Sequence, residues 1–353
     1  MIKLKGLSLI VKKNRETIKS FTFLFLPHFF LALVRRAEKL RAEGRKVLKT
    51  KIILIVGPTG AGKTQLALEI AQKIDAEIVA ADSMQIYRYM NIGTAKPTPQ
   101  EQALVPHYLL DIIDPDQDFS AGLYQTVASK AIDSILQKDK RVLVCGGTGL
   151  YIKSLIHGFF PGAQENRAID QELRAQEAQR GEGYLYHELT KVDPASALRI
   201  HPKDTFRIIR ALEVYYLTGL PISAHHEKHA FKETKYEYLQ IGIQWDRSFL
   251  YNRINLRCDQ MIKDGFIEEV RSLRARGYHS ELKSMQSLGY RHMCAFLNDK
   301  ILLEEAMRSM KRDTRRFAKR QLTWFRADAS IIWVENHLKN LNQIEKLIKN
   351  FLG

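Results

Sequence analysis

The order of apolar and polar positions predicts an alternating α/β region at the start of the main body of the chain. Short apolar runs at 51–56, 76–81, 107–113 and 141–145 are separated by longer segments with apolar residues at helical spacing. A short run that is apolar throughout is typical of a strand buried on both faces. Strands that alternate with helices predict a doubly wound parallel sheet covered by helices on both sides.

The alternation stops after residue 163. Residues 164–229 are helical in composition and contain no run that indicates a strand. Strand patterns return at 236–245 and 331–334, and the intervening segments have helical spacing, at 247–276, 283–297 and 302–324. We therefore expect a helical insertion domain at 164–229 within a core made of residues 51–163 and 230–353.

Residues 1–50 differ in composition from the rest. They hold 13 Lys and Arg against 3 Asp and Glu, which leaves +6 of the total charge of +16 for the remaining chain. The apolar run at 21–34 is shorter than the ~20 residues of a membrane span, and Val34-Arg35-Arg36 does not resemble a signal-peptide cleavage site. We expect a disordered or loosely helical extension with no membrane span; an overlong gene start would give the same pattern.

Composition adds only broad limits. The 353 residues suffice for one large domain or two, and the modest positive charge of the main body permits a polyanionic partner without requiring one. The three cysteines, Cys145, Cys258 and Cys294, have no metal-like spacing, which indicates free thiols in a reducing compartment.

The most specific motif, G-x-x-x-x-G-K-[ST], lies between the first strand and the first helix. Its residues are Gly57, Pro58, Thr59, Gly60, Ala61, Gly62, Lys63 and Thr64. In this context backbone N–H groups bind a diphosphate or nucleotide such as ATP, Lys63 reaches the outer phosphate, and the Thr64 hydroxyl binds Mg²⁺. The alternative, a chance glycine-rich turn, does not explain the flanking strand and helix.

Asp82 directly follows the strand at 76–81, where the sheet's carboxyl edge gathers ligands. Its carboxylate can bind Mg²⁺, often through water, or accept a proton from a nucleophile; the alternative is a cap of a turn or helix. The strand at 141–145, in contrast, ends in Gly146-Gly147-Thr148 and not in an acid. This disfavours a hydrolytic ATPase and favours an enzyme that stabilises a departing diphosphate.

Seven blocks in this order resemble the tRNA dimethylallyltransferase (tRNA isopentenyltransferase) family and span roughly residues 51–335. They are 57–64, 82–87 with 91–97, 106–111, 146–151, 201–204 with 207–213, 288–291 and 316–326. A single phosphate-binding loop would be unspecific, whereas the ordered set is specific.

The resemblance implies transfer of a dimethylallyl group from dimethylallyl diphosphate to N6 of the adenosine 3′-adjacent to the anticodon. The implied tRNAs read codons that begin with U, and pyrophosphate is released with Mg²⁺ as the metal. The implied catalytic residues are Asp82 as the base, with Thr64, Lys63 and Arg291.

The same resemblance implies a set of tRNA-binding residues. These are Asp82, Ser83, Met84, Gln85, Thr148, Phe206, Arg207, Ile208, Ile209, Arg210, Gln286, Ser287, Leu288, Gly289, Tyr290, Arg291, Arg315, Arg316, Lys319 and Arg320. Where many relatives have Gln, this chain has Phe206, so a polar interaction with the RNA is absent there or replaced by stacking. We expect a cytoplasmic monomer. A bacterial source is expected because the Cys/His pairs of the zinc finger in many eukaryotic relatives are missing.

Basic residues cluster at 311–326, with Asp313 as the only acid among them. Such a stripe suits phosphate contacts, and the alternative is a solvated helix face. The adjacent histidines at 225–229 cannot easily converge on one metal ion and indicate an exposed linker.

Two other functions remain open from the sequence. One is a small-molecule or nucleoside kinase that binds ATP with the same loop, which the missing acid after residue 145 disfavours. The other is a non-catalytic RNA-binding protein, which the presence of Lys63, Thr64 and Asp82 together disfavours.

Overall fold

The computed structural model describes residues 49–158, 166–229, 234–335 and 340–353 of the chain. The expectations for residues 1–48 therefore lie outside the described residues. No helix among the described residues is both long enough and apolar enough to cross a membrane.

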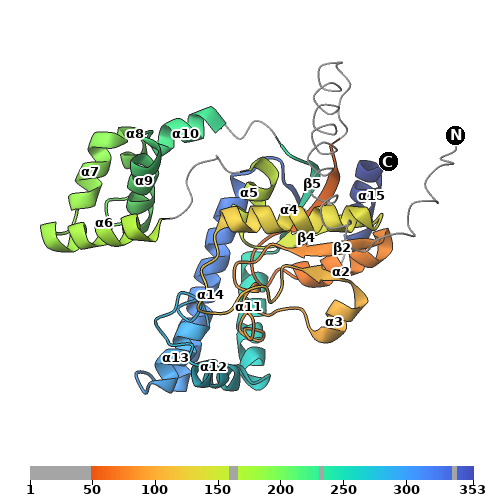
Figure 1. Cartoon of the computed structure of the whole chain (residues 1–353). Helices are drawn as coiled ribbons and strands as arrows, with labels where there is room; N and C mark the ends of the chain where they lie inside the picture. The colour runs from red at the N-terminus through yellow and green to blue at the C-terminus, as the bar shows by residue number, and fades with distance from the viewer. Residues whose placement is uncertain (1–48, 159–165, 230–233, 336–339) are drawn as a thin grey trace, which may run out of the picture. The chain divides into compact units, whose positions relative to one another are not determined.

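A six-stranded parallel sheet forms the centre of the main body (Figure 1). The strands run in the order β3-β2-β4-β1-β5-β6, with all neighbours parallel. Their bounds are β1 Lys51–Val56, β2 Ala76–Ala80, β3 His107–Tyr108, β4 Arg141–Gly146, β5 Glu237–Gln244 and β6 Ile332–Glu335. The predicted doubly wound α/β fold is thus confirmed.

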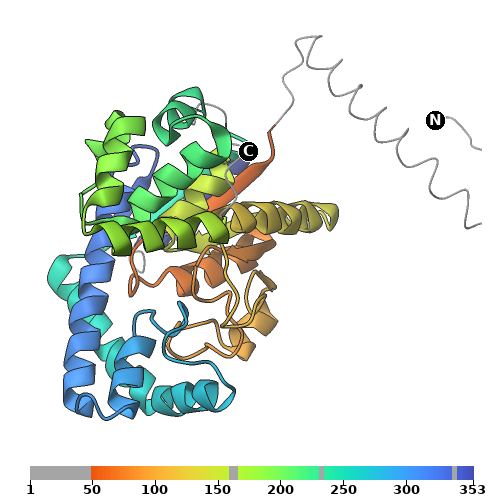
Figure 2. The ribbon, with the colours of Figure 1, turned by 60° about the vertical axis from the view of Figure 1, so that its left-hand side comes forward.

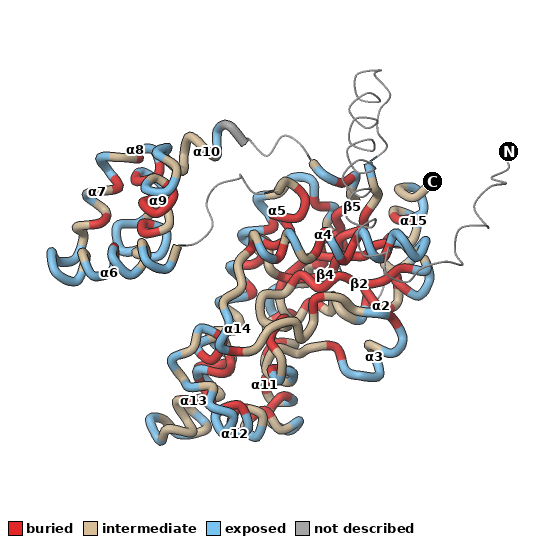
Figure 3. The backbone as a smooth tube through the Cα atoms, viewed as in Figure 1, coloured by how far each residue is buried: buried red, intermediate tan, exposed pale blue. Residues whose placement is uncertain are grey.

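Helices cover both faces of the sheet, because consecutive apolar strand residues point to opposite sides. Ile52 and Leu54 of β1 pack with α4 (Ala121–Gln137) and α5 (Gly149–His157). Ile53 and Ile55 pack on the other face with α2 (Lys63–Ile74) and α15 (Leu341–Leu352). The central strands are accordingly buried (Figure 3), and burying each such isoleucine contributes about 1.5–3 kcal/mol.

A third hydrophobic cluster joins four C-terminal helices to the loop that follows β2. These are α11 Arg247–Lys263, α12 Phe266–Ala275, α13 Tyr290–Leu297 and α14 Leu303–Arg326. Ile86 and Met90 of the loop pack with Phe266 and Tyr290 in this cluster. Both views show α14 running from beside α5 to α13 (Figures 1 and 2).

Five helices within 166–229 enclose a hydrophobic core of their own, which includes Leu173, Leu189 and Leu212. They are α6 Arg167–Arg180, α7 Tyr184–Val192, α8 Pro194–Ala197, α9 Thr205–Thr218 and α10 Ile222–His229. The chain leaves the sheet after α5 and returns beside the same point, since the Lys235 N–H donates to the Ile156 carbonyl at 3.0 Å.

Three predicted elements differ from the structure. The strand expected at 107–113 has only two residues, because Leu109 and Asp111 take left-handed backbone angles with φ of 67° and 56°. The helix expected over 247–276 is interrupted at Gly265, where φ is 97°. The helix expected from 283 begins only at Tyr290, and the short α3 (Pro99–Leu104), capped by Thr98 and Glu101, was not predicted.

Candidate functional site

The loop from Gly57 to Gly62 joins β1 to α2 and directs the helix N-terminus towards the carboxyl edge of the sheet. Gly62 caps α2 in the left-handed region with φ of 92°, a conformation that a residue with a Cβ rarely adopts. The first N–H groups of α2 have no partners within the helix and are available to an anion. This arrangement has the geometry that the predicted phosphate cradle requires.

Lys63, the first residue of α2, is a half-buried cation. Its Nζ donates to the Pro58 carbonyl at 2.9 Å, and among the described residues it forms no ion pair. Burial lowers the pKa of the Lys63 ammonium, and the nearby Cys145 and Asp82 partly oppose this shift. A cation held this way is stabilised when an anion enters the cradle.

Arg257 of α11 is a second cation at the cradle, and the sequence interpretation missed it. Its Nη1 lies 3.4 Å from the Thr59 hydroxyl, and burial lowers the pKa of its guanidinium, opposed by Asp82. One helical turn earlier, Arg253 donates from Nε to the Gly60 carbonyl at 2.9 Å. The four-residue spacing of Arg253 and Arg257 could be read from the sequence, but nothing in the sequence connects that helix face to the loop at 57–62.

Asp82 follows β2 and lines the same cavity as Lys63 and Thr64. Its Oδ1 accepts the backbone N–H groups of Met84 at 2.8 Å and Gln85 at 3.4 Å. The carboxylate therefore caps a turn, as one interpretation expected, and still faces the cavity. Burial raises the pKa of the neighbouring Cys145 thiol to about 11, which keeps that group protonated and unreactive at neutral pH.

Thr148 connects two strand ends at the site. It occupies the N-cap position of α5, and its Oγ1 accepts the Ser83 N–H at 3.0 Å. Its own N–H donates to the Ala81 carbonyl at 3.1 Å. These bonds hold the turn after β4 against the segment that carries Asp82.

Gln321 of α14 links the C-terminal helix to the phosphate cradle. Its side-chain Oε1 accepts the Thr59 N–H at 2.8 Å, and its Nε2 donates to the Gly147 carbonyl at 2.9 Å. The side chain is buried, so both bonds are shielded from water. Sequence reasoning placed Gln321 in a matching block but assigned it no role.

A cavity of about 150 Å³ lies among these elements. Its polar lining includes Lys63, Thr64, Asp82 and Arg257, together with Ser83, Gln85 and Thr148. Its apolar lining includes Ile254, Met261, Leu288, Met310 and Phe317. A lining that combines cations with an apolar surface suits a small molecule with a phosphorylated head and an apolar tail.

Arg291 is not brought together with the other predicted catalytic residues. It does not line this cavity, and its Nη2 pairs with Asp313 of α14 at 2.7 Å. Burial alone would raise the pKa of Asp313, but hydrogen bonds from Arg312, Arg291 and His292 hold that pKa well below its usual range.

The other residues implied as tRNA contacts fall into three groups. Ile208 and Ile209 lie in the core of the insertion, and Tyr290 is buried with its hydroxyl donating to Glu269 at 2.6 Å. Ser287, Leu288 and Gly289 line the cavity. Phe206, Arg207 and Gln286 are exposed, whereas Arg210 pairs with the buried Glu213.

The basic stripe of α14 is divided by its contacts. Lys311 pairs with Asp259 at 2.6 Å, and Arg315 donates to Asn255 Oδ1 at 2.7 Å. Arg316, Lys319 and Arg320 line an open groove with Trp324, whose exposed ring can stack; of these three cations, Arg316 also lies 3.8 Å from the Asp313 carboxylate. No three His, Cys, Asp or Glu side chains converge as metal ligands within the described ranges.

Comparisons with known proteins agree with each other. A model of the IPP transferase family matches residues 85–328. A tRNA dimethylallyltransferase from Desulfosudis oleivorans is 48% identical over 304 residues, which cover 86% of this chain and 96% of that protein. The corresponding protein from Geobacter metallireducens is 50% identical over 289 residues, covering 81% and 93%.

Solved structures give the same group of relatives. The full-length tRNA isopentenylpyrophosphate transferase from Bacillus halodurans matches with a TM-score of 0.64 and 39% identity, over 86% of this chain and 97% of that chain. A eukaryotic dimethylallyltransferase acting on tRNA matches with a TM-score of 0.72 and 27% identity, over 85% and 79%.

Proposed function

Because this chain belongs to the IPP transferase family, we propose that it transfers a dimethylallyl group from dimethylallyl diphosphate to N6 of an adenosine in tRNA. The acceptor is the adenosine 3′-adjacent to the anticodon in tRNAs that read codons beginning with U, and pyrophosphate is released. The observation that carries the proposal is the cavity where Lys63 and Arg257 meet Asp82 and an apolar lining.

The diphosphate of the donor binds the cradle of Gly57–Thr64. The amides of the loop and the cations of Lys63 and Arg257 stabilise the negative charge that develops as pyrophosphate departs. An allylic group can bear positive character, so its bond to the diphosphate breaks readily once that charge is stabilised. The apolar lining holds the five-carbon group and excludes water.

Asp82 acts on the acceptor. With Oδ1 occupied by the turn at Met84 and Gln85, its Oδ2 accepts the proton that N6 loses as the new C–N bond forms. The adenine must leave the anticodon stack to reach this recessed site, as in other enzymes that act on a base. Thr148, beside Ser83 at the cavity, lies where it can contact the incoming base.

Mg²⁺ fits this lining as the metal. It is usually held by one or two protein oxygens together with substrate phosphates and waters, so a site with few protein ligands is expected. The Thr64 hydroxyl lines the cavity and would hold it, while Asp82 stays free to act as the base. When bound, the ion would neutralise part of the charge on the departing pyrophosphate.

The protein acts, in this proposal, as a monomer in the bacterial cytoplasm, where tRNA is available. The three bacterial relatives named above support a bacterial source. The kinase alternative is disfavoured because β4 ends at Gly146, is followed by Gly147, and supplies no acid to the site.

The direct test is incubation of the purified protein with dimethylallyl diphosphate, Mg²⁺ and tRNA, followed by nucleoside analysis. We expect N6-(dimethylallyl)adenosine next to the anticodon, and its loss from tRNA of a strain without the gene. Lys63→Ala and Thr64→Ala should weaken donor binding and slow transfer. A phosphorylated product with ATP would establish the kinase instead, and RNA binding without any product would establish a binding protein.

A further inference from the structure

One carboxylate that has no role in the proposed reaction accepts hydrogen bonds from four donors. Glu269, in the first turn of α12, accepts the backbone N–H groups of Asn91, Ile92 and Gly93 at 2.9, 2.7 and 3.1 Å. The Tyr290 hydroxyl donates to the same group at 2.6 Å. Four donors on one charged acceptor make a rigid contact, because charge-assisted hydrogen bonds are about twice as strong as neutral ones.

The loop that Glu269 holds forms part of the cavity wall. Gly93, Thr94 and Ala95 line the cavity directly. A Cβ at Gly93 would lie 2.2 Å from the Phe266 ring and 2.6 Å from the Tyr290 ring, so the backbone packs closely against these aromatics. The position of this part of the cavity wall is therefore fixed by Glu269, Phe266 and Tyr290.

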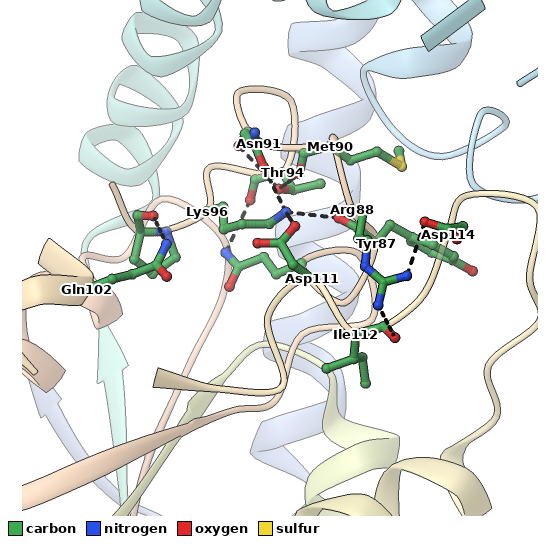
Figure 4. Close-up of polar contacts among 12 residues, drawn as sticks. Tyr87, Arg88, Met90, Asn91, Thr94, Lys96, Gln102, Asp111, Ile112 and Asp114 are labelled. Carbon is green, nitrogen blue, oxygen red and sulfur yellow. Dashed lines mark hydrogen bonds and ion pairs between the residues drawn. The ribbon is translucent and has the colours of Figure 1, made fainter. Parts of the chain in front are cut away.

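The inner side of this loop is tied to the segment after Asp82. Gln85 donates from Nε2 to the Thr94 and Ala95 carbonyls at 3.3 and 3.1 Å. Lys96 donates to the Tyr87 carbonyl at 2.9 Å and to Asp111 at 2.6 Å (Figure 4). Because the Gln85 N–H also bonds Asp82, the loop and the proposed base belong to one hydrogen-bonded unit.

We propose that Glu269, with Tyr290, is a positioning residue that sets the 91–95 wall and thereby fits the cavity to a five-carbon donor. This deepens the proposed function and rests on it. A wall held at fixed distance excludes a longer allylic chain and keeps the bound donor aligned with Asp82. A loosened wall loses alignment for the five-carbon donor and admits a longer one.

The charge of Glu269 is the feature to test, because glutamine keeps the size of the side chain. In Glu269→Gln the side chain keeps only one acceptor oxygen for the four donors. Its NH₂ group is itself a donor and cannot accept a hydrogen bond from the loop N–H groups. The matched control is Glu268→Gln in the same helical turn. Glu268 is exposed and pairs only with Arg271, at 3.5 Å, among its described contacts.

The experiment compares the full-length variants in steady-state transfer to tRNA from dimethylallyl diphosphate and from geranyl diphosphate. For Glu269→Gln we expect kcat/KM with the five-carbon donor to fall about 10–100-fold, as for the loss of charged hydrogen bonds. Preference for the shorter donor should fall about tenfold. The Kd for inorganic pyrophosphate, which binds the cradle alone, should stay within a few-fold, and Glu268→Gln should match the wild type.

Tyr290→Phe removes only the hydroxyl and keeps the three loop bonds, so it should change both quantities in the same direction by less. If Glu269→Gln does not fold, Tyr290→Phe alone tests the proposal. Unchanged kcat/KM and donor preference in these variants would overturn the proposal. So would an equal loss with both donors that follows a lowered Tm, since that is the result of general destabilisation. A wild-type protein without prenyl transfer would instead overturn the proposed function.

Discussion

One oxygen of the Asp82 carboxylate is already occupied, because Oδ1 accepts the N–H groups of Met84 and Gln85. An amide oxygen can accept the same two bonds, but an amide cannot take up a proton at neutral pH. Turn geometry and proton transfer therefore depend on different chemical properties of one side chain, and two substitutions can separate them.

Asp82→Asn should keep the turn and lose the base. We expect kcat to fall about 10²–10⁴-fold, as for a missing general base, with the Kd for inorganic pyrophosphate nearly unchanged. Asp82→Ala should lose the same rate and also lower Tm, because two backbone donors lose their partner. Single-turnover transfer rates and thermal melts of both variants check this. A kcat for Asp82→Asn within a few-fold of wild type would contradict the assignment of Asp82 as base.

At the scale of elements, α14 presents two kinds of cation. Lys311 and Arg315 are bound to α11 through Asp259 and Asn255, and Arg315 also lies over the Tyr251 ring. Arg316, Lys319 and Arg320 line the open groove near Trp324. The Arg315 guanidinium connects α14 to α11, so we expect it to contribute to stability in addition to any role in RNA binding.

Neutralising Arg316, Lys319 or Arg320 should weaken tRNA binding about equally for all substrate tRNAs. Removing one phosphate contact should reduce the slope of log K against log salt by roughly 0.7–0.9. Lys311→Ala is the control, since its ammonium is paired with Asp259, and Arg315→Ala should lower Tm more than it changes the slope. The tRNA affinity of each variant, measured from low to high salt, decides the matter. Identical slopes in every variant would make the stripe a solvated face.

Local patterns predicted the elements whose contacts are close in sequence. The loop 57–64 and Asp82 follow strands that could be recognised from consecutive apolar residues. Arg257, Glu269 and Gln321 could not be assigned, because they reach the site from 176–262 residues away and each sits on an otherwise ordinary helix. The strand predicted at 107–113 was too long, since nothing in the sequence indicates left-handed angles at Leu109 and Asp111, which end β3 at Tyr108.

At the scale of the whole molecule, the insertion has a hydrophobic core of its own. Its buried residues pack with each other, and the chain enters and leaves it beside one hydrogen bond, from Lys235 to Ile156. Closing a short loop at this point costs little conformational entropy. The sheet and its cavity should therefore not depend on the insertion for folding.

Replacing residues 164–229 by a short Gly/Ser linker should leave a folded protein that binds inorganic pyrophosphate within a few-fold of wild type. Transfer to tRNA should be lost, because Phe206 and Arg207, exposed on the insertion, are removed. Circular dichroism, calorimetric titration with pyrophosphate and nucleoside analysis test the three statements. A deletion protein that is unfolded, or that still modifies tRNA at the normal rate, would contradict this division of roles.

The bond between the Thr59 amide and Gln321 joins residues 262 positions apart, and this separation has a consequence during synthesis. At about 5–20 residues per second, a ribosome needs roughly 13–52 seconds to pass from Thr59 to Gln321. Once Thr64 has been added, and for the rest of that interval, the emerging chain carries every residue of its phosphate-binding motif but lacks the helix that completes the site. β1 also lacks one of its two neighbouring strands until β5, which ends at Gln244, has been synthesised. A chain that terminates early thus keeps the recognisable motif and never assembles the site.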